Sequence, residues 1–217
     1  MGRYTTGRLL GVFLVALLLV AGGGVARAQP VDHYVLALSW SPTYCANEGR
    51  SRDSRQCGLE ADYRFIVHGL WPNTANSAPA YCRTRHSGPS RRLIRAMLDI
   101  MPDQGLVLYQ WRKHGTCSGL SAPEYFGLVR DAAERVVVPP GLATLRKTIT
   151  VEPSVLREAF RRANPTIPED GIYVACRGPE LVDVRICLTT SLEPQVCPHV
   201  RNQRCRTRSL TISPGPG

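Results

Sequence analysis

Two short runs of this 217-residue chain hold the residues best suited to chemistry. They are Arg64–Pro72 (RFIVHGLWP) and Tyr109–Cys117 (YQWRKHGTC), and in each run a histidine directly precedes a glycine. These histidines are His68 and His114, and Lys113 lies beside the second. No plausible set of metal ligands surrounds either one. Two histidines and a cation are the groups needed for acid–base chemistry on a phosphodiester.

Metal-free cleavage of an RNA phosphodiester makes three demands that these groups meet. A base takes the proton of the 2′-hydroxyl, and an acid protonates the departing 5′-oxygen. Each transfer is worth roughly 10²- to 10⁴-fold in rate. A fixed positive charge must also stabilise the crowded phosphorane between them. His68 and His114 fit the transfer roles, and Lys113 fits the third.

Structural roles are the alternative for the histidines and tryptophans. A histidine in a strand-to-loop turn is more often structural than catalytic, and no motif surrounds the remaining three, which are His33, His86 and His199. Trp71 fits a hydrophobic core as well as a ligand site. Trp111, on a predicted helix, fits a core better.

The first 28 residues have the order of a secretory signal peptide, with Arg3 and Arg8 before the apolar Leu9–Val20 and a small-residue end at Ala28. The alternative is an uncleaved membrane anchor, but the apolar run is shorter than the roughly 20 residues that span a bilayer. We expect cleavage after Ala28, a single domain over residues 29–217, no later membrane contact, and a periplasmic or secreted location. The leader holds three arginines and no acid, so the mature chain keeps +7 of the +10 charge. A basic exported protein favours polyanions such as nucleic acid.

All eight cysteines follow the leader, and an even number behind an export signal predicts disulfides. The chain alone leaves the pairing open. The alternative is a zinc site, for which the candidate ligands are Cys187, Cys197, His199 and Cys205. Their spacing is irregular and the chain has no Cys-x-x-Cys pair, which disfavours zinc.

Apolar periodicity predicts strands at both ends of the mature chain and helices between them, which favours an α+β fold. The predicted strands are His33–Trp40, Arg64–Val67, Gly171–Cys176, Leu181–Thr189 and Leu210–Ile212. The predicted helices are Arg91–Ile100, 107–114, a capped helix from Ser121 to about Val136, and Ser154–Ala163. Gly69 and Pro72 are expected to end the second strand. Residues 45–57 and 73–90 are predicted loops. Helical spacing would place Gln110, Lys113 and His114 on one face. The buried stripe of the last helix is expected to hold Val155, Ala159, Phe160 and Ala163.

Phe65–Pro72 and Trp111–Cys117 closely resemble the two active-site segments of the ribonuclease T2 family. Both long runs occur in the right order and at a suitable separation. Leu36–Cys45 is similar to the first strand of that family and the cysteine after it. Ile172–Cys176 and Val184–Leu188 resemble its closing strands, so that the likeness covers most of the mature chain.

This resemblance implies an antiparallel sheet packed against several helices, with the first motif on a strand and the second on a helix. It implies endonucleolytic cleavage of single-stranded RNA through a 2′,3′-cyclic phosphate, with no cofactor or metal and low base specificity. By position, His114 is the expected general base, His68 the general acid and Lys113 the stabilising cation. The implied disulfides are Cys45–Cys57, Cys82–Cys117, Cys176–Cys205 and Cys187–Cys197.

The chain departs from the family at two positions of the second motif. Gln110 stands where relatives commonly carry a glutamate that helps to stabilise the phosphorane, and Tyr109 replaces a phosphate-binding histidine. We expect Gln110 to be catalytic as a hydrogen-bond donor. The residues expected to bind substrate are Trp71, Tyr109, Trp40 and Ser39, the last in place of a glutamine in a base subsite.

Three hypotheses follow. The chain is an exported, monomeric ribonuclease that acts on RNA and leaves DNA intact, because DNA lacks the 2′-hydroxyl nucleophile. Alternatively, Gln110 and Tyr109 mark a catalytically weakened relative that binds RNA or inhibits. The third hypothesis is a basic, disulfide-rich surface-binding protein with structural histidines. Intact His68, Lys113 and His114 favour the first.

Overall fold

The computed structural model describes residues 1–2, 30–47, 54–58, 61–198 and 205–214. His199 and all of the predicted leader except its first two residues therefore lie outside the described residues. The strands are β1 His33–Trp40, β2 Phe65–Asn73, β3 Ile149–Val151, β4 Ile172–Arg177, β5 Glu180–Thr189 and β6 Leu210–Ile212. The helices are α1 Ser41–Asn47, α2 Ser54–Cys57, α3 Arg91–Met97, α4 Gln104–Lys113, α5 Ala122–Glu134, α6 Pro140–Ala143 and α7 Pro153–Ala163, with 3₁₀ turns at Gly115–Cys117 and Glu169–Gly171.

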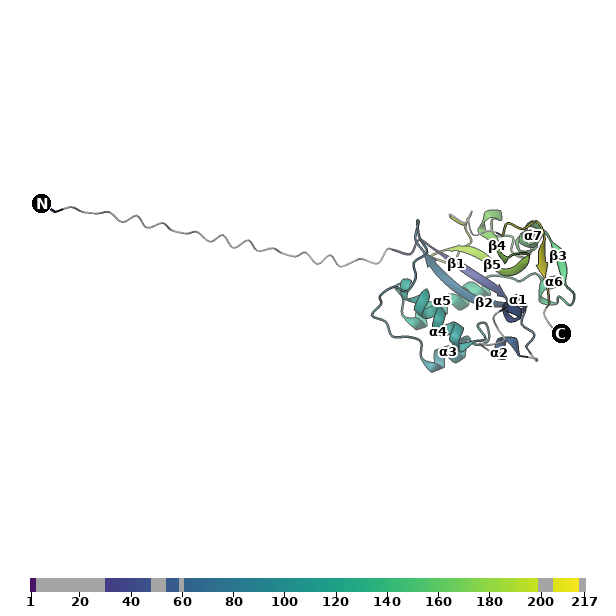
Figure 1. The fold of residues 1–217 in the computed structure, drawn as a ribbon, viewed down its shortest axis with the longest axis horizontal. Coiled ribbons are helices and arrows are strands. Elements are labelled where there is room, and N and C mark those ends of the chain that lie inside the picture. Colours follow the sequence, from purple (N-terminus) through teal and green to yellow (C-terminus); the bar gives the residue numbers. More distant parts are fainter. Residues whose placement is uncertain (3–29, 48–53, 59–60, 199–204, 215–217) are drawn as a thin grey trace.

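The strands form one sheet in the order β2-β1-β5-β6-β3, and β4 pairs with β5. All pairings are antiparallel except that of β5 with β6, which is parallel through Glu180 and Thr211. Figure 1 shows α3, α4 and α5 gathered beside β2, and α6 and α7 near β3 and β4 at the other end of the molecule. This arrangement confirms the predicted α+β fold.

One large hydrophobic core joins the sheet to the helices. It includes Leu36, Trp40 and Leu70 from β1 and β2, together with Phe126 and Phe160 from α5 and α7, all fully buried. Alternate residues of β1 enter this core, as the period of a strand requires. None of the helices in the described part of the chain is both long and apolar enough to cross a membrane.

The capping prediction for α5 is confirmed. The Glu124 carboxylate accepts from the backbone N–H of Ser121 at 2.8 Å, which is half of a capping box, and the helix ends close to the predicted position. The buried stripe predicted for α7 was right at Phe160 and wrong at Val155. Leu156 and Phe160 form the buried pair, whereas Val155 is 53% exposed. A step of one residue rotates a side chain by about 100°, which carries Val155 off the buried stripe.

The first histidine motif differs most from expectation. The prediction that Gly69 and Pro72 end the second strand was wrong, because β2 continues to Asn73 and Pro72 pairs with Tyr34. β2 is the end strand of the sheet, where a proline is tolerated at a position whose missing N–H faces away from the neighbour. The predicted loop at 45–57 also contains the short helix α2 and the end of α1.

Candidate active site

His68 lies at a β-bulge in β2. In the ladder with β1, Ala37 faces Gly69 and the next residue, Leu38, faces Val67, so that His68 is the extra residue without a partner strand residue. A bulge bends the strand locally and re-aims the side chain of the extra residue. The His68 ring is one-third exposed. This local irregularity turns the histidine out of the alternating pattern of the strand and into the site.

His114 is presented by the C-terminal end of α4. Its backbone N–H donates to the carbonyl of Gln110 at 2.9 Å, and the Gly115–Cys117 turn follows directly. The side chain is only 8% exposed. Gly115 is required here, because an added Cβ would overlap the ring of Trp111. The disulfide Cys82–Cys117 ties this turn to the loop after β2.

Trp71 stands between the two histidines. Its ring stacks on His114 with centroids 5.2 Å apart and an interplanar angle of 24°, and it meets His68 edge-to-face at 5.4 Å. The Trp71 Nε1 donates to Oε1 of Gln110 at 3.0 Å. Gly69 allows this approach, since a Cβ there would overlap Gln110 Oε1 and lie 2.8 Å from Trp71 Nε1. The two motifs, distant in sequence, thus form one site.

The bond from Trp71 also fixes the orientation of the Gln110 amide. An indole N–H can only donate, so it requires the amide oxygen on its side and turns Nε2 the other way. Gln110 is 1% exposed, and its Nε2 has no hydrogen-bond partner among the described residues. A buried donor left unpaired costs about 1–3 kcal/mol.

Burial lowers the proton affinity of His114. Desolvation first, and then the positive charges of Lys113 and His68, lower the pKa of His114 from its ordinary value of 6.5 to about 3. His114 is therefore neutral at ordinary pH and free to accept a proton. Its Nδ1 is buried without a partner in the described structure, so exchange with a substrate falls to Nε2.

Lys113 and Tyr109 lie together on α4. The Lys113 ammonium lies 5.3 Å from the centre of the Tyr109 ring. Hydrogen bonds with Lys113 and Tyr81 lower the pKa of Tyr109. The loop that carries Tyr81 is fixed to this end of the helix, because the backbone N–H of Tyr81 donates to the carbonyl of Lys113 at 2.8 Å. A cation and two phenol groups are thus grouped at the end of α4 that precedes His114.

Asp183 and Arg185 on β5 belong to the site, and neither was predicted from the sequence. Asp183 Oδ1 lies 3.4 Å from His68 Nδ1, and its other oxygen accepts from Arg185 Nη2 at 2.9 Å. The Arg185 guanidinium lies 4.7 Å from the centre of the Trp71 ring. The signal that could have found them is an acid and a base two residues apart in an otherwise apolar strand (LVDVRICL), where charges are rare unless paired.

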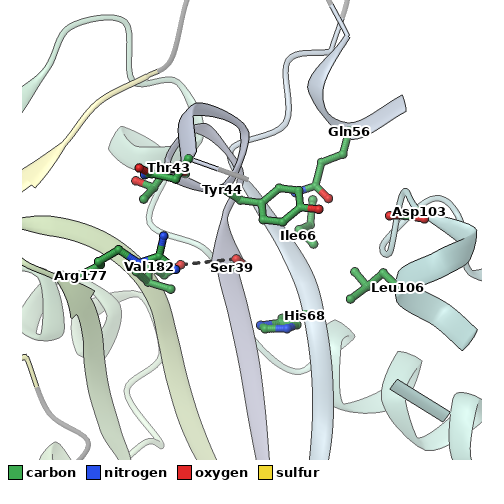
Figure 2. A pocket seen from close by; sticks show the side chains of 11 residues that line it. Ser39, Thr43, Tyr44, Gln56, Ile66, His68, Asp103, Leu106, Arg177 and Val182 are labelled. Carbon is green, nitrogen blue, oxygen red and sulfur yellow. Dashed lines mark hydrogen bonds between the residues drawn. The ribbon is translucent and has the colours of Figure 1, made fainter. Parts of the chain in front are cut away.

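A cavity of about 220 Å³ opens beside His68. Figure 2 shows His68 at one end, with Ser39 and Ile66 of the sheet along its floor and Tyr44 and Gln56 above them. The other lining residues are Thr43, Asn47, Asp103, Leu106, Arg177 and Val182. The cavity combines aromatic, aliphatic and polar groups, a lining typical of sites for planar organic ligands.

The remaining predicted substrate contacts divide into two groups. Ser39 lines the cavity, and its hydroxyl lies 3.5 Å from the Val182 carbonyl. Trp40 does not reach the site. It is 0% exposed in the core, and its Nε1 donates to the carbonyl of Ser213 at 2.8 Å. The expectation that Trp40 contacts substrate is therefore corrected: it follows Ser39 on β1 and points to the opposite face. Trp111 is also buried and packs against Tyr125.

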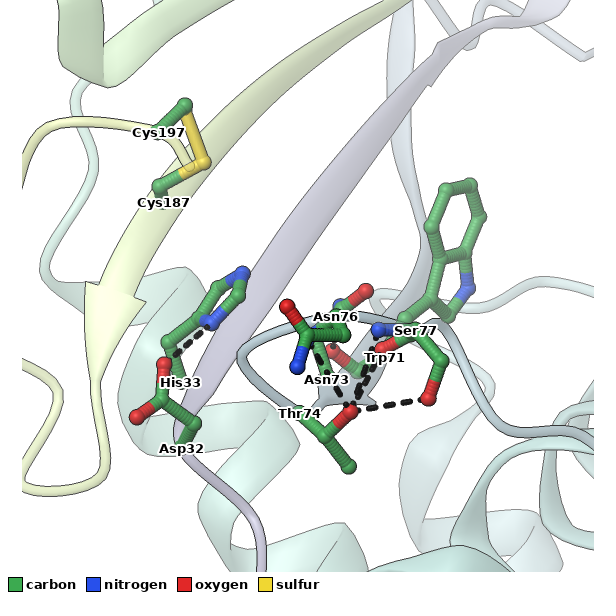
Figure 3. A network of polar contacts seen from close by, with 9 residues as sticks. All are labelled: Asp32, His33, Trp71, Asn73, Thr74, Asn76, Ser77, Cys187 and Cys197. Carbon is green, nitrogen blue, oxygen red and sulfur yellow. Dashed lines mark hydrogen bonds and ion pairs between the residues drawn. A yellow bond between two sulfur atoms is a disulfide. The ribbon is translucent and has the colours of Figure 1, made fainter. Parts of the chain in front are cut away.

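The last residue of β2 and the turn that follows it lie next to Trp71 in the chain and support its backbone. The Asn73 side chain donates to the carbonyl of Trp71 at 2.9 Å, and Thr74 Oγ1 accepts from the backbone N–H of Ser77 at 3.1 Å (Figure 3). His33 lies at the start of β1 with its Nδ1 3.1 Å from Asp32. It is buried there, across the ladder from Asn73, and contributes no group to the site described above.

The four disulfides are Cys45–Cys57, Cys82–Cys117, Cys176–Cys205 and Cys187–Cys197, as the family resemblance implied. The zinc alternative was wrong, because its three cysteines are all in disulfides. Its histidine, His199, lies outside the described residues.

Comparisons with known proteins find ribonucleases among the relatives of this chain. A ribonuclease of Aeromonas hydrophila is 33% identical over 147 residues, which are 67% of this chain and 65% of that protein. A probable ribonuclease of Haemophilus influenzae is 33% identical over 128 residues, 54% of this chain and 47% of the relative. The chain thus spans between about half and two thirds of the length of these relatives.

Solved structures share the fold. RNase NT in complex with 5′-AMP has a TM-score of 0.64 at 23% identity, and the match covers 84% of this chain and 98% of that one. A single-residue mutant of RNase MC1 in complex with 5′-UMP has a TM-score of 0.65 at 19% identity, with 83% and 98% covered. The two histidine motifs meet at Trp71, as described above. The sequence model of the Ribonuclease T2 family matches residues 31–197, and the chain therefore belongs to that family.

Proposed function

We propose that this protein is an endoribonuclease that cleaves single-stranded RNA by transphosphorylation, without a metal ion, through a 2′,3′-cyclic phosphate. The observation that carries the proposal is the unlike surroundings of two histidines on either side of one tryptophan. His114 is buried beside a cation and is neutral, whereas His68 lies beside the buried carboxylate of Asp183. Two histidines with such different neighbours suit two different roles, with His114 as the base and His68 as the acid.

In this mechanism His114 Nε2 takes the proton of the 2′-hydroxyl, whose oxygen attacks the adjacent phosphorus. His68 gives its proton to the 5′-oxygen as the P–O bond to that oxygen breaks. Lys113 and the unpartnered amide N–H of Gln110 stabilise the negative charge that develops on the phosphorane. The products are a 2′,3′-cyclic phosphate and a free 5′-hydroxyl. All of these groups come from one chain.

Two further features support RNA as the substrate. The mature chain is basic, and related structures were solved with 5′-AMP and 5′-UMP. The cavity beside His68 would accept the base next to the scissile phosphate. Ser39 has only a short hydroxyl there, close to the Val182 carbonyl, so no long amide at that position reads a base edge. We propose low base specificity because position 39 lacks the glutamine expected in a base subsite.

Gln110 favours the alternative of a catalytically weakened RNA binder. Its amide oxygen is occupied by Trp71, and an amide can neither shuttle a proton nor attract a charged His114. In the ribonuclease proposal, the unpartnered Nε2 is assigned the hydrogen bond to a phosphorane oxygen. A turnover assay separates the two proposals, because they agree on RNA binding and differ on product.

The test is incubation of the mature protein with a dinucleoside monophosphate from pH 4 to pH 8 in the presence of EDTA. We expect a 2′,3′-cyclic phosphate product that is lost in His68→Ala and in His114→Ala, and no cleavage of the 2′-deoxy analogue. RNA binding without product would favour the weakened relative. Cleavage of the deoxy analogue at a comparable rate would exclude the proposed mechanism.

Export from the cytoplasm completes the proposal. Four disulfides form and persist in oxidising compartments, and the first 28 residues have the pattern of a cleaved leader. The N-terminal sequence of the protein recovered from periplasm or medium tests this, and we expect it to begin at Gln29. Recovery with the leader intact would contradict cleavage.

A further inference from the structure

Asp183 is the buried carboxylate of the site and has two partners. Its side chain is 1% exposed on β5. One oxygen lies 3.4 Å from His68 Nδ1, and the other accepts from both Nη2 and Nε of Arg185, at 2.9 and 3.3 Å. A charged carboxylate is almost never buried unless it is paired. Arg185 and His68 supply that pairing.

The register of three strands explains how Asp183 reaches His68. Asp183 pairs with Ser39 of β1, and Arg185 pairs with Ala37. β1 lies between β5 and β2. Because Ser39 and Ala37 are small, they leave room on β1 for the longer side chains of Asp183 and His68 to approach each other across this strand. On the far side, the bulge at His68 turns its ring toward β1. An imidazole on β2 and a carboxylate on β5 thus meet across the middle strand.

Arg185 holds the second oxygen of Asp183 and is itself fixed between two aromatic rings. Its guanidinium lies 4.7 Å from the centre of Trp71 and 5.7 Å from that of Tyr173, the residue paired with it on β4. Cation–π contacts of this kind orient the guanidinium plane. Although burial alone would raise the pKa of Asp183, its bonds to His68 and Arg185 outweigh burial and lower it. The carboxylate is therefore charged.

We propose that Asp183 is a positioning residue for His68, and that it holds the proton of the neutral ring on Nδ1 and directs Nε2 toward the leaving oxygen. The inference rests on the proposed function and assigns a role within it. Arg185 fixes the carboxylate and links it to Trp71, which stacks on His114. One ion pair on β5 therefore orients the acid directly and supports the base through the tryptophan.

The alternative is that Asp183 only forms a structural ion pair with Arg185. Arg185 alone would satisfy the buried carboxylate in that case. The contact from Asp183 Oδ1 to an imidazole nitrogen is the additional feature. Other charged or titratable groups near His68 are His114 on α4 and, around the cavity, Tyr44, Asp103 and Arg177. Among these groups and Asp183, all in the described part of the chain, Asp183 is the one whose side chain lies within hydrogen-bonding distance of the His68 ring.

The first test is the tautomer of His68 in the wild-type protein, read from the ¹⁵N shifts of its ring by NMR. We expect the neutral ring to carry its proton on Nδ1. A proton on Nε2 would overturn the proposal. This result does not depend on turnover, so it distinguishes failure of the positioning role from failure of the ribonuclease proposal.

The second test is Asp183→Asn, assayed with a dinucleoside monophosphate. We expect kcat to fall by about 10- to 100-fold, by analogy with the loss of a carboxylate that orients a metal-bound histidine. KM should change by less than about threefold, because the base cavity is untouched. An unchanged kcat would overturn the proposal.

A double-mutant cycle with His68→Ala, measured on the residual single-turnover rate at high enzyme concentration, shows whether Asp183 acts through His68. If it does, Asp183→Asn will cause no further loss in the His68→Ala background, whereas an independent structural effect would give additive losses. Asp99→Asn is the matched control. Asp99 pairs with Arg130 at 2.8 Å on the surface, away from the site, and its loss should leave the rate unchanged. If Asp183→Asn fails to fold, the tautomer measurement still decides.

Discussion

The burial of His114 has a measurable consequence for folding. The folded protein keeps this histidine neutral down to about pH 3, whereas an unfolded chain protonates it below pH 6.5. Between these values the unfolded state binds more protons, so acid favours unfolding. The stabilising contribution is complete above pH 6.5 and is lost as the pH falls toward 3. With about 1.4 kcal/mol for each tenfold change in proton affinity, the loss is about 2 kcal/mol at pH 5 and about 4 kcal/mol at pH 3.

Urea denaturation of wild-type protein and His114→Asn, with disulfides intact, isolates this effect. Other groups titrate equally in both proteins, and no carboxylate contributes to the shift of His114, so their contributions cancel in the difference. We expect the free energy of unfolding of the wild type, relative to the variant, to fall by about 2 kcal/mol from pH 7.5 to pH 5. The absolute cost of the substitution does not matter, because only the slope with pH is compared.

Parallel pH dependences for the two proteins would refute the reasoning. They would mean that His114 titrates alike in both states, and therefore that it is not desolvated as its 8% exposure indicates. The assignment of His114 as a base held neutral would then lose its support. A direct NMR titration of the His114 ring in the folded protein provides an independent check.

Three further predictions concern the contacts that hold the two motifs in place. Gly69→Ala places a Cβ against Gln110 and Trp71, so it should lower the free energy of unfolding by about 1–3 kcal/mol and reduce kcat. Gly127→Ala on α5, where a Cβ meets nothing within 4 Å, should instead raise stability by up to about 1 kcal/mol with kcat unchanged; urea denaturation distinguishes them. Replacing Cys82 and Cys117 together by serine should cost about 2–4 kcal/mol and reduce kcat, since the disulfide fixes the turn after His114; equal kcat would show that the turn needs no cross-link. Gln110→Glu should move the acid limb of the pH–rate profile to higher pH, because a nearby carboxylate stabilises protonated His114; a limb that stays in place would show that residue 110 does not act on His114.

Most of the fold was predictable because its elements are locally encoded. β1 was predicted with its observed bounds, and the Ser121 cap located the start of α5. The disulfide pairs came from the family resemblance, since spacing alone does not fix connectivity. β2 was predicted too short, because Gly69 and Pro72 are strand breakers in a local window. Their tolerance depends on β2 being the end strand and on Gln110 packing over Gly69, which are tertiary facts.

Residues of the candidate site could be predicted where they lie in one of the two histidine motifs, but Asp183 and Arg185, which lie outside both motifs, could not. His68, His114, Lys113 and Gln110 fall within the two runs, and the structure brings these runs together through Trp71. Trp40 was assigned to the site from its neighbourhood in sequence, but strand alternation points it into the core. Whether a side chain on β1 faces the site depends on the register of the sheet, which a single sequence leaves open.

The absence of a carboxylate at position 110 changes how charge is distributed in this site. Gln110 leaves His114 without an acidic neighbour, so burial and Lys113 act on it unopposed and keep it neutral. The buried carboxylate of the site is instead Asp183, on the opposite side, where it contacts His68. A base must begin neutral and an acid must begin protonated. An amide at position 110 brings no negative charge that would hold a proton on His114, and it is therefore compatible with the role of His114 as the base in the proposed chemistry.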